Sequence, residues 1–274
     1  MIGIFDSGLG GLTVVREVMR QLPEFPIVYF GDTARTPYGA KSRETIIKYA
    51  LEDADFLVKQ GAKILVVACN TVSSVAVESL KEKFNLPVFE VIGLSAKKAV
   101  EITKNGRIGV IGTRATIGSK VYEREILCHS ELLFCHSERS EESHINKQIQ
   151  TFSQPCPLLV SLVEENWIDK PETKTIVRKY LSSLKSKQID TLILGCTHYP
   201  FLKDIIQKKI GRQVAIVDSA EEVSKDLKQY LVESEIKFES TPNKFFLSDL
   251  TLHAQNLAFK WLGRDIKIQK AVLQ

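Results

Sequence analysis

The chain opens, after Met1, with the stretch Ile2-Gly3-Ile4-Phe5-Asp6-Ser7-Gly8-Leu9-Gly10-Gly11, and a helical pattern from Leu12 to Gln21 follows it. A short apolar run that ends at an aspartate is typical of a buried strand, and the glycines indicate a tight turn into the helix. Further apolar runs occupy residues 27–30 and 64–68, and a helical pattern covers residues 44–59. Strands rich in Ile and Val that alternate with helices indicate parallel βαβ units.

The same pattern restarts in the second half of the chain. Residues 108–113, Ile-Gly-Val-Ile-Gly-Thr, repeat the character of the opening stretch position by position. A predicted helix at residues 173–187 leads into a predicted strand at 191–195, which ends at Cys196. A helix with apolar positions three and four residues apart then ends at Gly211. Each half therefore reads strand, Ser/Thr turn, intervening units, helix, strand, cysteine, helix, and we expect two related α/β halves.

In the first half the matching cysteine is Cys69, at the end of the strand predicted at 64–68. The helix expected after it carries an apolar stripe from Val72 to Leu80. The second half is longer. Ser7 and Cys69 are 62 residues apart, whereas their counterparts Thr113 and Cys196 are 83 apart, so the second half has 21 extra residues.

Residues 128–148 form a stretch of that length with a biased composition, and we expect an inserted surface loop without a chemical role. It contains a small repeat, Cys128-His129-Ser130-Glu131 followed seven residues later by Cys135-His136-Ser137-Glu138. The two Cys-His pairs raise the alternative of a zinc-binding interaction module. Adjacent Cys-His pairs do not match the spacing that lets one zinc ion meet four ligands, so we expect no metal site.

The composition limits the class of protein. With 274 residues, of which 44% are apolar, the chain is long enough for about two globular domains and is neither fibrous nor disordered. A net charge of +4 without a Lys/Arg-rich run argues against nucleic acid as a partner. No stretch approaches the roughly 18 apolar residues of a membrane span, and the start does not resemble a signal peptide. We therefore expect a cytoplasmic protein that does not bind membranes.

The five cysteines point to the chemistry. An odd number at uneven spacing does not suggest a disulfide framework, so each cysteine is a buried filler, a metal ligand or a reactive thiol. Cys69 and Cys196 each lie between a predicted strand and a predicted helix. Ligands of parallel α/β folds bind beyond the carboxyl ends of the strands. The partial positive charge at a helix N-terminus predicts that these thiols favour the thiolate form.

Two thiols that face each other suit the inversion of a carbon that bears an acidic C–H. One group removes the proton from one face, the other delivers a proton to the opposite face, and the roles exchange for the reverse reaction. A thiol, with an ordinary pKa of about 8.5, serves in either role after a small shift of its pKa. Asp6 and His198 are candidate helpers of the two thiols. A redox disulfide is the alternative, disfavoured because the chain has no C-x-x-C motif.

The glycine turn after Asp6 resembles a nucleotide-binding loop but fails its tests. Thr13 stands where G-x-G-x-x-G requires glycine, and no G-K-[ST] follows. The turn instead offers backbone N–H groups to a small anion such as a carboxylate. Residues 36–39, Thr-Pro-Tyr-Gly, form a second predicted turn, in which the hydroxyl of Tyr38 is available to a ligand. Both turns have the alternative reading of simple chain reversals.

Several motifs together make the chain, from residue 2 to about residue 225, resemble the bacterial glutamate racemases of the aspartate/glutamate racemase superfamily. The motifs are Asp6-Ser7-Gly8-Leu9-Gly10-Gly11, Asp32-Thr33-Ala34-Arg35-Thr36-Pro37-Tyr38-Gly39, Ala68-Cys69-Asn70-Thr71, Gly112-Thr113-Arg114-Ala115-Thr116 and Gly195-Cys196-Thr197-His198-Tyr199-Pro200. The resemblance implies racemisation of glutamate without a cofactor or metal, which would supply D-glutamate for peptidoglycan synthesis. An aspartate or related acidic amino-acid racemase is the alternative, because the same two thiols serve either substrate.

The resemblance also implies roles for individual residues. Cys69 and Cys196 match the two acid/base thiols, with Asp6 and His198 as further catalytic candidates and Glu164 as a weaker one. The matched substrate-binding positions are Asp6, Ser7, Tyr38, Gly39, Asn70, Thr71, Thr197 and His198. The expected partner is the small substrate, and a homodimer is the generic expectation for an oligomer.

The family fold implies two pseudo-symmetric, doubly wound parallel-sheet domains with the active site between them. Residues 1–96 and 212–274 would form the first domain and residues 97–211 the second, with the loop insertion at 128–148.

Overall fold

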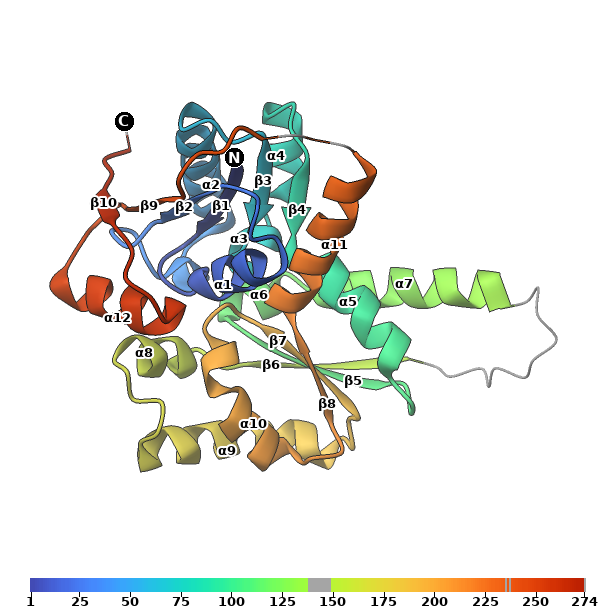
Figure 1. Ribbon diagram of the computed structural model, residues 1–274. Coiled ribbons are helices and arrows are strands. Elements are labelled where there is room, and N and C mark those ends of the chain that lie inside the picture. The colour runs from blue at the N-terminus through green and yellow to red at the C-terminus, as the bar shows by residue number, and fades with distance from the viewer. Residues whose placement is uncertain (138–148, 235, 237, 274) are drawn as a thin grey trace. The chain divides into compact units, whose positions relative to one another are not determined.

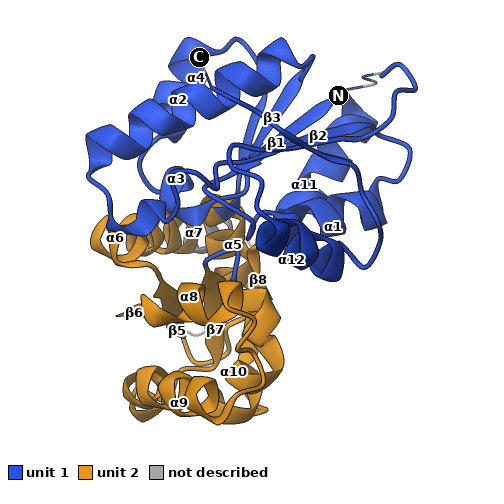
Figure 2. Ribbon diagram, turned by 90° about the vertical axis from the view of Figure 1, so that its left-hand side faces the viewer, with its two compact units in different colours: residues 1–91, 196–198, 220–274 blue, residues 92–195, 199–219 orange. Residues whose placement is uncertain are grey.

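The computed structural model describes residues 1–137, 149–234, 236 and 238–273 (Figure 1). The chain divides into two compact units (Figure 2): unit 1 comprises Met1–Val91, Cys196–His198 and Ala220–Gln274, and unit 2 comprises Ile92–Gly195 and Tyr199–Ser219. Each unit contains its own sheet, and every strand pair in both sheets is parallel. The predicted class, two parallel-sheet α/β domains, is confirmed.

Unit 1 has a six-stranded sheet in the order β10-β9-β2-β1-β3-β4. Its strands are β1 (Ile2–Asp6), β2 (Ile27–Gly31), β3 (Ile64–Val67), β4 (Val88–Glu90), β9 (Lys244–Leu247) and β10 (Ile268–Lys270). Its helices are α1 (Leu12–Gln21), α2 (Arg43–Lys59), α3 (Asn70–Ser73), α4 (Val77–Lys83), α11 (Ser219–Glu233) and α12 (Leu252–Leu262), with a 3₁₀ turn, η1 (Tyr38–Ala40). Figure 2 shows α2 and α4 on one side of the sheet and α1, α11 and α12 on the other. Strands β1, β2 and β3 are therefore buried along their whole length.

Unit 2 has a four-stranded sheet in the order β6-β5-β7-β8. Its strands are β5 (Arg107–Gly112), β6 (Gln150–Pro155), β7 (Thr191–Gly195) and β8 (Ala215–Asp218). Its helices are α5 (Val91–Ile102), α6 (Arg114–Gly118), α7 (Val121–Ser137), α8 (Leu158–Glu164), α9 (Pro171–Ser186) and α10 (Lys203–Ile210), with a 3₁₀ turn, η2 (Tyr199–Leu202). Helices α9 and α10 pack against each other (Figure 1). Among the described helices of either unit, none is both long and apolar enough to cross a membrane.

The two sheets share one topology. Across β2-β1-β3-β4 and across β6-β5-β7-β8, neighbouring positions in the sheet are taken by the strands that come second, first, third and fourth along the chain. A shared glycine has the same packing role in both. A Cβ on Gly3 would lie 2.6 Å from the Cβ of Ala62, and a Cβ on Gly109 would lie 2.5 Å from Cδ1 of Ile189. The residue two positions before the third strand therefore packs on the first strand in each unit, which explains why the opening pattern recurs.

This strand order determines where a ligand site forms. The chain moves from the first strand to the second on one side and then to the third strand on the other side, so a crevice forms at the carboxyl ends of the first and third strands. In unit 1 those ends carry Asp6 and Cys69. In unit 2 the first strand, β5, is followed by Thr113, and the third strand, β7, is followed by Cys196. Residues 196–198 are themselves part of unit 1.

The prediction of one continuous helix from Val72 to Leu80 is wrong, because the structure divides this segment into α3 and α4. Ser73 Oγ donates to the carbonyl of Val67 at 3.3 Å, and Ser74 Oγ donates to the carbonyl of Thr71 at 2.8 Å. Hydroxyls that bond to nearby carbonyls compete with continued helix, so the first helix ends after about one turn.

The loop predicted at 128–148 is wrong for its first part. Helix α7 continues to Ser137, because Leu127, Glu131 and Leu132 belong to residue types of high helix propensity. Residues 138–148 lie outside the described residues. The tail also contains strands that the sequence did not predict: β9 pairs with β2 and β10 pairs with β9. Runs of three or four residues are too short to carry a period-2 signal.

The sheet of unit 1 is stabilised by large apolar side chains that its helices bury against it. Leu80 of α4 is fully buried, whereas Leu252 of α12 is 81% exposed. We expect Leu80→Ala to lower the free energy of unfolding by about 2–5 kcal/mol, because it leaves a cavity in the core. The matched change Leu252→Ala is expected to stay within about 0.5 kcal/mol of wild type. Urea unfolding followed by circular dichroism measures both, and equal effects would contradict the assigned core.

Candidate active site

Asp6 lies at the end of β1 and is completely buried. Its Oδ2 accepts a hydrogen bond from the backbone N–H of Gly8 at 3.0 Å, and its Oδ1 accepts from Thr197 Oγ1 at 3.3 Å. Burial raises the pKa of the Asp6 carboxyl above its ordinary value, while the nearby His198 and the backbone N–H of Gly11 act in the opposite direction. The glycine turn and residues 196–198 are therefore joined to β1 through one carboxylate.

The glycine turn leaves no room for side chains. A Cβ on Gly10 would lie 2.3 Å from Thr197 Oγ1 and 2.7 Å from the His198 ring, and a Cβ on Gly11 would lie 2.4 Å from the Cβ of Asp6. Tyr29 on β2 holds the turn from below, because its hydroxyl donates to the Gly8 carbonyl at 2.7 Å. The glycines predicted to form a turn are thus required for a close approach of Thr197 and His198.

Cys69 follows β3 and is the N-terminal cap residue of α3. Its thiol donates to Ser7 Oγ at 3.4 Å. Burial, followed by the negative charge of Asp6, raises the pKa of the Cys69 thiol to about 12. The prediction that the helix N-terminus makes this group a thiolate is therefore wrong, because desolvation and a neighbouring carboxylate outweigh the partial charge of a helix of four residues. At neutral pH Cys69 carries its proton.

Cys196 has a different neighbour. Its Sγ lies 3.7 Å from Nδ1 of His198. The backbone of this segment is fixed by Thr13 of α1, whose hydroxyl donates to the Thr197 carbonyl at 3.2 Å. The His198 ring meets Trp261 of α12 edge to face, with 6.2 Å between ring centroids. Cys196 and His198 are both buried, so an imidazole, which can accept or donate a proton, is held beside the second thiol.

Asn70 and Thr71 are buried at the start of α3, directly after Cys69. With Asp6, Ser7, Cys69, Cys196, Thr197 and His198 they belong to unit 1. The structure therefore brings most of the predicted site residues into one compact unit, around the carboxyl ends of β1 and β3. Glu164, the weaker candidate, ends α8 in unit 2.

The hydroxyl of Tyr38 is bound inside the protein. It forms hydrogen bonds with Asp32 Oδ2 and, at 3.0 Å, with Asp53 Oδ2, and the side chain is fully buried. The prediction that this hydroxyl is available to a ligand is therefore wrong. Burial, together with the charges of Asp53 and Asp32, raises the pKa of the Tyr38 hydroxyl. Contact between substrate and the backbone of Tyr38 and the half-buried Gly39 remains a prediction.

Sequence reasoning missed several supporting residues. Thr13, Tyr29 and Trp261 hold the glycine turn, the Thr197 carbonyl and the His198 ring, and Asp53 binds Tyr38. Tyr29 lay in an apolar run and Asp53 in a helical pattern, so neither position carried a local signal. The one signal for Asp53 in the sequence is its place among the apolar positions of the helical pattern, where an aspartate is unusual.

No group of three or more Cys, His, Asp or Glu side chains within the described part of the chain could hold a metal ion. In the alternative zinc cluster, Cys128 is exposed and His129 lies 4.0 Å from Glu125 in α7. The side chains of Cys135 and His136 lie outside what the structure describes. The zinc-module hypothesis thus gains no support from Cys128 and His129.

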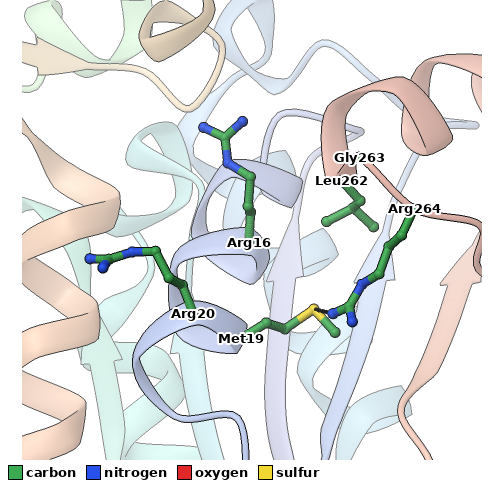
Figure 3. A pocket seen from close by; sticks show the side chains of 6 residues that line it. All are labelled: Arg16, Met19, Arg20, Leu262, Gly263 and Arg264. Atoms are coloured by element: carbon green, nitrogen blue, oxygen red, sulfur yellow. Dashed lines mark hydrogen bonds between the residues drawn. The ribbon is translucent and has the colours of Figure 1, made fainter.

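A surface hollow of about 280 Å³ in unit 1 is lined by none of the predicted site residues (Figure 3). Its lining residues are Arg16, Met19, Arg20, Leu262, Gly263 and Arg264. Its arginines do not converge: Arg16 and Arg20 point in different directions, and Arg264 points to Met19. Arg16 donates to the Trp261 carbonyl at 3.5 Å, and Arg20 pairs with Glu17 on its own helix. The hollow therefore does not gather groups around one ligand.

The fold and site define a class of protein: a doubly wound α/β enzyme with two buried thiols, each beside its own polar helper, at the carboxyl ends of parallel strands. Such a site is suited to proton transfer. The model of the Asp/Glu/hydantoin racemase family matches residues 10–225. The chain belongs to this family and is an amino-acid racemase, which is an isomerase.

Individual relatives agree over nearly the whole length. The chain is 47% identical to a glutamate racemase of Persephonella marina over 99% of its own length and 97% of the relative. It resembles the crystal structure of a glutamate racemase isoform from Bacillus anthracis with a TM-score of 0.88 and 37% identity, covering 100% of this chain and 97% of that one. A glutamate racemase from Francisella tularensis in complex with D-glutamate matches with a TM-score of 0.87 and 35% identity, covering 99% and 97%.

The close approach at Gly10 yields a test of the site. We expect Gly10→Ala to lower kcat/KM for racemisation by about 100-fold, because the added methyl group displaces Thr197 and His198. Gly118→Ala is the matched control, since a Cβ there meets nothing within 4 Å. Steady-state kinetics with both folded variants measures the effect, and equal activity of the two would show that the approach at Gly10 is unimportant.

Proposed function

We propose that the chain interconverts L- and D-glutamate without a cofactor, by a two-base mechanism in which Cys69 and Cys196 act on opposite faces of the α-carbon. One observation carries the proposal: a buried thiol follows the third strand in each of two sheets with the same topology. The relatives named above, which are glutamate racemases, and the neighbour that holds D-glutamate support glutamate as the substrate.

The reaction needs no net change of charge or oxidation state. One thiolate takes the α-proton from one face of the substrate and becomes a thiol. The opposite thiol gives its proton to the other face of the resulting carbanion and becomes a thiolate, so the enzyme ends as the mirror-image protonation state. The raised pKa of Cys69 favours the form in which Cys69 holds a proton to deliver, and His198, 3.7 Å from Cys196, can accept or return the proton of the second thiol. The resemblance to the glutamate racemases assigns Cys196 to L-glutamate and Cys69 to D-glutamate.

Removal of the α-proton is difficult because the substrate carboxylate stays ionised and no electron sink is bound. The protein must stabilise the developing negative charge with donors that are already oriented. The side chains of Ser7, Asn70 and Thr71 and the backbone N–H of Thr197 supply such donors, while the Thr197 hydroxyl itself donates to Asp6. Within the turn, the backbone N–H groups of Leu9 and Gly10 serve this role, because those of Gly8 and Gly11 bind Asp6. The turn is fixed by Tyr29 and Asp6, so its donors do not need to reorganise as charge develops.

The remaining roles follow from this assignment. The backbone of Tyr38 and Gly39 contacts the substrate. The negative charge of Asp6 raises the pKa of Cys69, and His198 exchanges a proton with Cys196. The product D-glutamate would serve peptidoglycan synthesis in the cytoplasm. A homodimer remains a generic prediction. Aspartate is the alternative substrate, because the thiols act on the α-carbon whatever the length of the side chain.

The two-base mechanism makes a prediction about isotope exchange. In deuterated water, wild-type enzyme should incorporate solvent deuterium into the product enantiomer at early times and not into recovered substrate, because different groups remove and deliver the proton. We expect Cys69→Ser and Cys196→Ser each to lower racemisation by at least about 100-fold. Circular dichroism follows racemisation, and mass spectrometry of the separated enantiomers follows exchange.

Cys128→Ser is the matched control, because Cys128 is an exposed thiol on α7 and should leave activity unchanged. Near-normal turnover in either active-site variant, or early deuterium in recovered substrate at the same rate as in product, would contradict the mechanism. Parallel assays with L- and D-aspartate decide the substrate, since inversion of aspartate but not glutamate would overturn that assignment.

The charge of Asp6 leads to a prediction about the pH dependence of racemisation. Because its negative charge raises the pKa of Cys69, Asp6→Asn should lower the pH at which the thiol pair loses its last proton. The alkaline limb of kcat/KM should therefore move to lower pH. It should move equally for both enantiomers, because their equal free energies require equal kcat/KM in the two directions. Asp55→Asn on α2, with an exposed carboxylate, is the control. An alkaline limb that stays in place would show that Asp6 does not control Cys69.

A further inference from the structure

A buried ionic cluster lies beside the turn that contains Tyr38. Its members are the carboxylates of Asp32, Glu52 and Asp53, the guanidinium of Arg35 and the hydroxyl of Tyr38. Arg35 forms ion pairs with Asp32 and Glu52, and with Asp53 at 2.9 Å. Asp32, Asp53 and Tyr38 are completely buried. All five belong to unit 1.

The cluster is fixed on every side. The guanidinium of Arg35 lies over the ring of Tyr49, 3.9 Å from its centroid. Oδ1 of Asp32 accepts a hydrogen bond from Ser248 Oγ at 2.7 Å, and Ser248 Oγ in turn accepts from the backbone N–H of Ala34 at 2.8 Å. The cluster therefore ties the segment after β2 to the end of β9 and to helix α2.

The same cluster is connected to the active site by backbone. The N–H of Asp32 donates to the carbonyl of Asp6 at 3.0 Å. Turn η1, which begins at Tyr38, contacts α3, the helix that follows Cys69. The Tyr38 side chain points into the cluster, so its backbone and that of Gly39 are the parts of the turn left for other contacts. The position of this backbone depends on where the Tyr38 hydroxyl is held.

The electrostatics of the cluster favour a shared proton. Three carboxylates face one guanidinium, and two of them are fully buried. Burial, with the charge of Asp32, raises the pKa of Asp53. An uncompensated buried carboxylate is costly, whereas a protonated Asp53 accepts from Arg35 at Oδ1 and donates from Oδ2 to the oxygen of Tyr38, whose own hydrogen goes to Asp32. An amide of the same shape replaces the protonated acid, because it has one oxygen that accepts from Arg35 and one N–H that donates to Tyr38.

We propose that Asp53 and Arg35 are positioning residues for the racemase reaction: through the Tyr38 hydroxyl they hold the Tyr38–Gly39 backbone against α3 in the geometry that binds the substrate. This inference rests on the proposed function, in which that backbone contacts glutamate. The cluster itself touches no reacting atom. Its loss should therefore weaken substrate binding while the two thiols keep their chemistry.

The test compares KM with kcat for both glutamate enantiomers. Tyr38→Phe removes the hydroxyl and keeps the ring, and Asp53→Ala removes the carboxyl group. Each is expected to raise KM by about 10-fold and to change kcat by less than about 3-fold, in line with the loss of a charge-assisted hydrogen bond. Asp53→Asn keeps both contacts, since the amide oxygen accepts from Arg35 and the amide N–H donates to the Tyr38 oxygen, whose own hydrogen goes to Asp32. It should bring KM to within about 3-fold of wild type.

Two controls separate positioning from stability. Tyr49→Phe keeps the ring that stacks on Arg35 and should leave KM unchanged. Leu80→Ala should lower the melting temperature of unit 1 without raising KM, because it acts on α4 and not on the cluster. If Tyr38→Phe fails to fold, Asp53→Ala against Asp53→Asn carries the comparison.

Three results would overturn the inference: wild-type KM in Tyr38→Phe and Asp53→Ala, a rise in KM of the same size in Leu80→Ala, or an Asp53→Asn variant as impaired as Asp53→Ala. Failure of the proposed function is distinguishable, since it would appear as wild-type protein that does not racemise glutamate.

Discussion

The buried carboxylate of Asp6 is the constraint on which the site depends. A charge removed from water must be compensated, and the N–H groups of Gly8 and Gly11 and the hydroxyl of Thr197 do this. Those bonds draw the glycine turn and residues 196–198 to the end of β1, at a distance that only glycine tolerates at positions 10 and 11. The same charge raises the pKa of Cys69. One carboxylate therefore sets both the shape of the turn and the protonation of a thiol.

The duplicated topology gives the two thiols equivalent places but different surroundings. Cys69 donates a hydrogen bond to Ser7, and the negative charge of Asp6 raises its pKa, whereas Cys196 lies beside His198. The proposed two-base reaction runs in both directions and needs one group that gives a proton and one that takes a proton. The repeated sheet supplies the symmetry of position, and the unlike neighbours supply the asymmetry of charge. The two sheets thus share one strand order, and the polar residues at their strand ends differ.

Much of this arrangement was readable in the sequence, because it depends on short contiguous patterns. Buried strands, glycine turns and the cysteine after each third strand are local signals, and parallel topology brings the strand ends together. The failures have one cause. Whether the Tyr38 hydroxyl is free, whether Cys69 is a thiolate and whether a helix continues past Ser73 all depend on partners distant in sequence or on burial, which single residues do not reveal. The strands β9 and β10 were missed because they are short and gain their stability by pairing with β2 and with each other.

The sequence by itself determined the fold class, the repeat of one plan in two halves, the two strand-end thiols and the resemblance to a racemase family. It did so because hydrophobic periodicity and glycine placement are properties of neighbouring residues. Only the tertiary structure decided which groups carry protons and which hold the turns: Asp53 and Arg35 around Tyr38, Tyr29 beneath Gly8, and His198 beside Cys196. Protonation follows from desolvation and from charges brought close by folding, and both are set by three-dimensional neighbours that lie far apart along the chain.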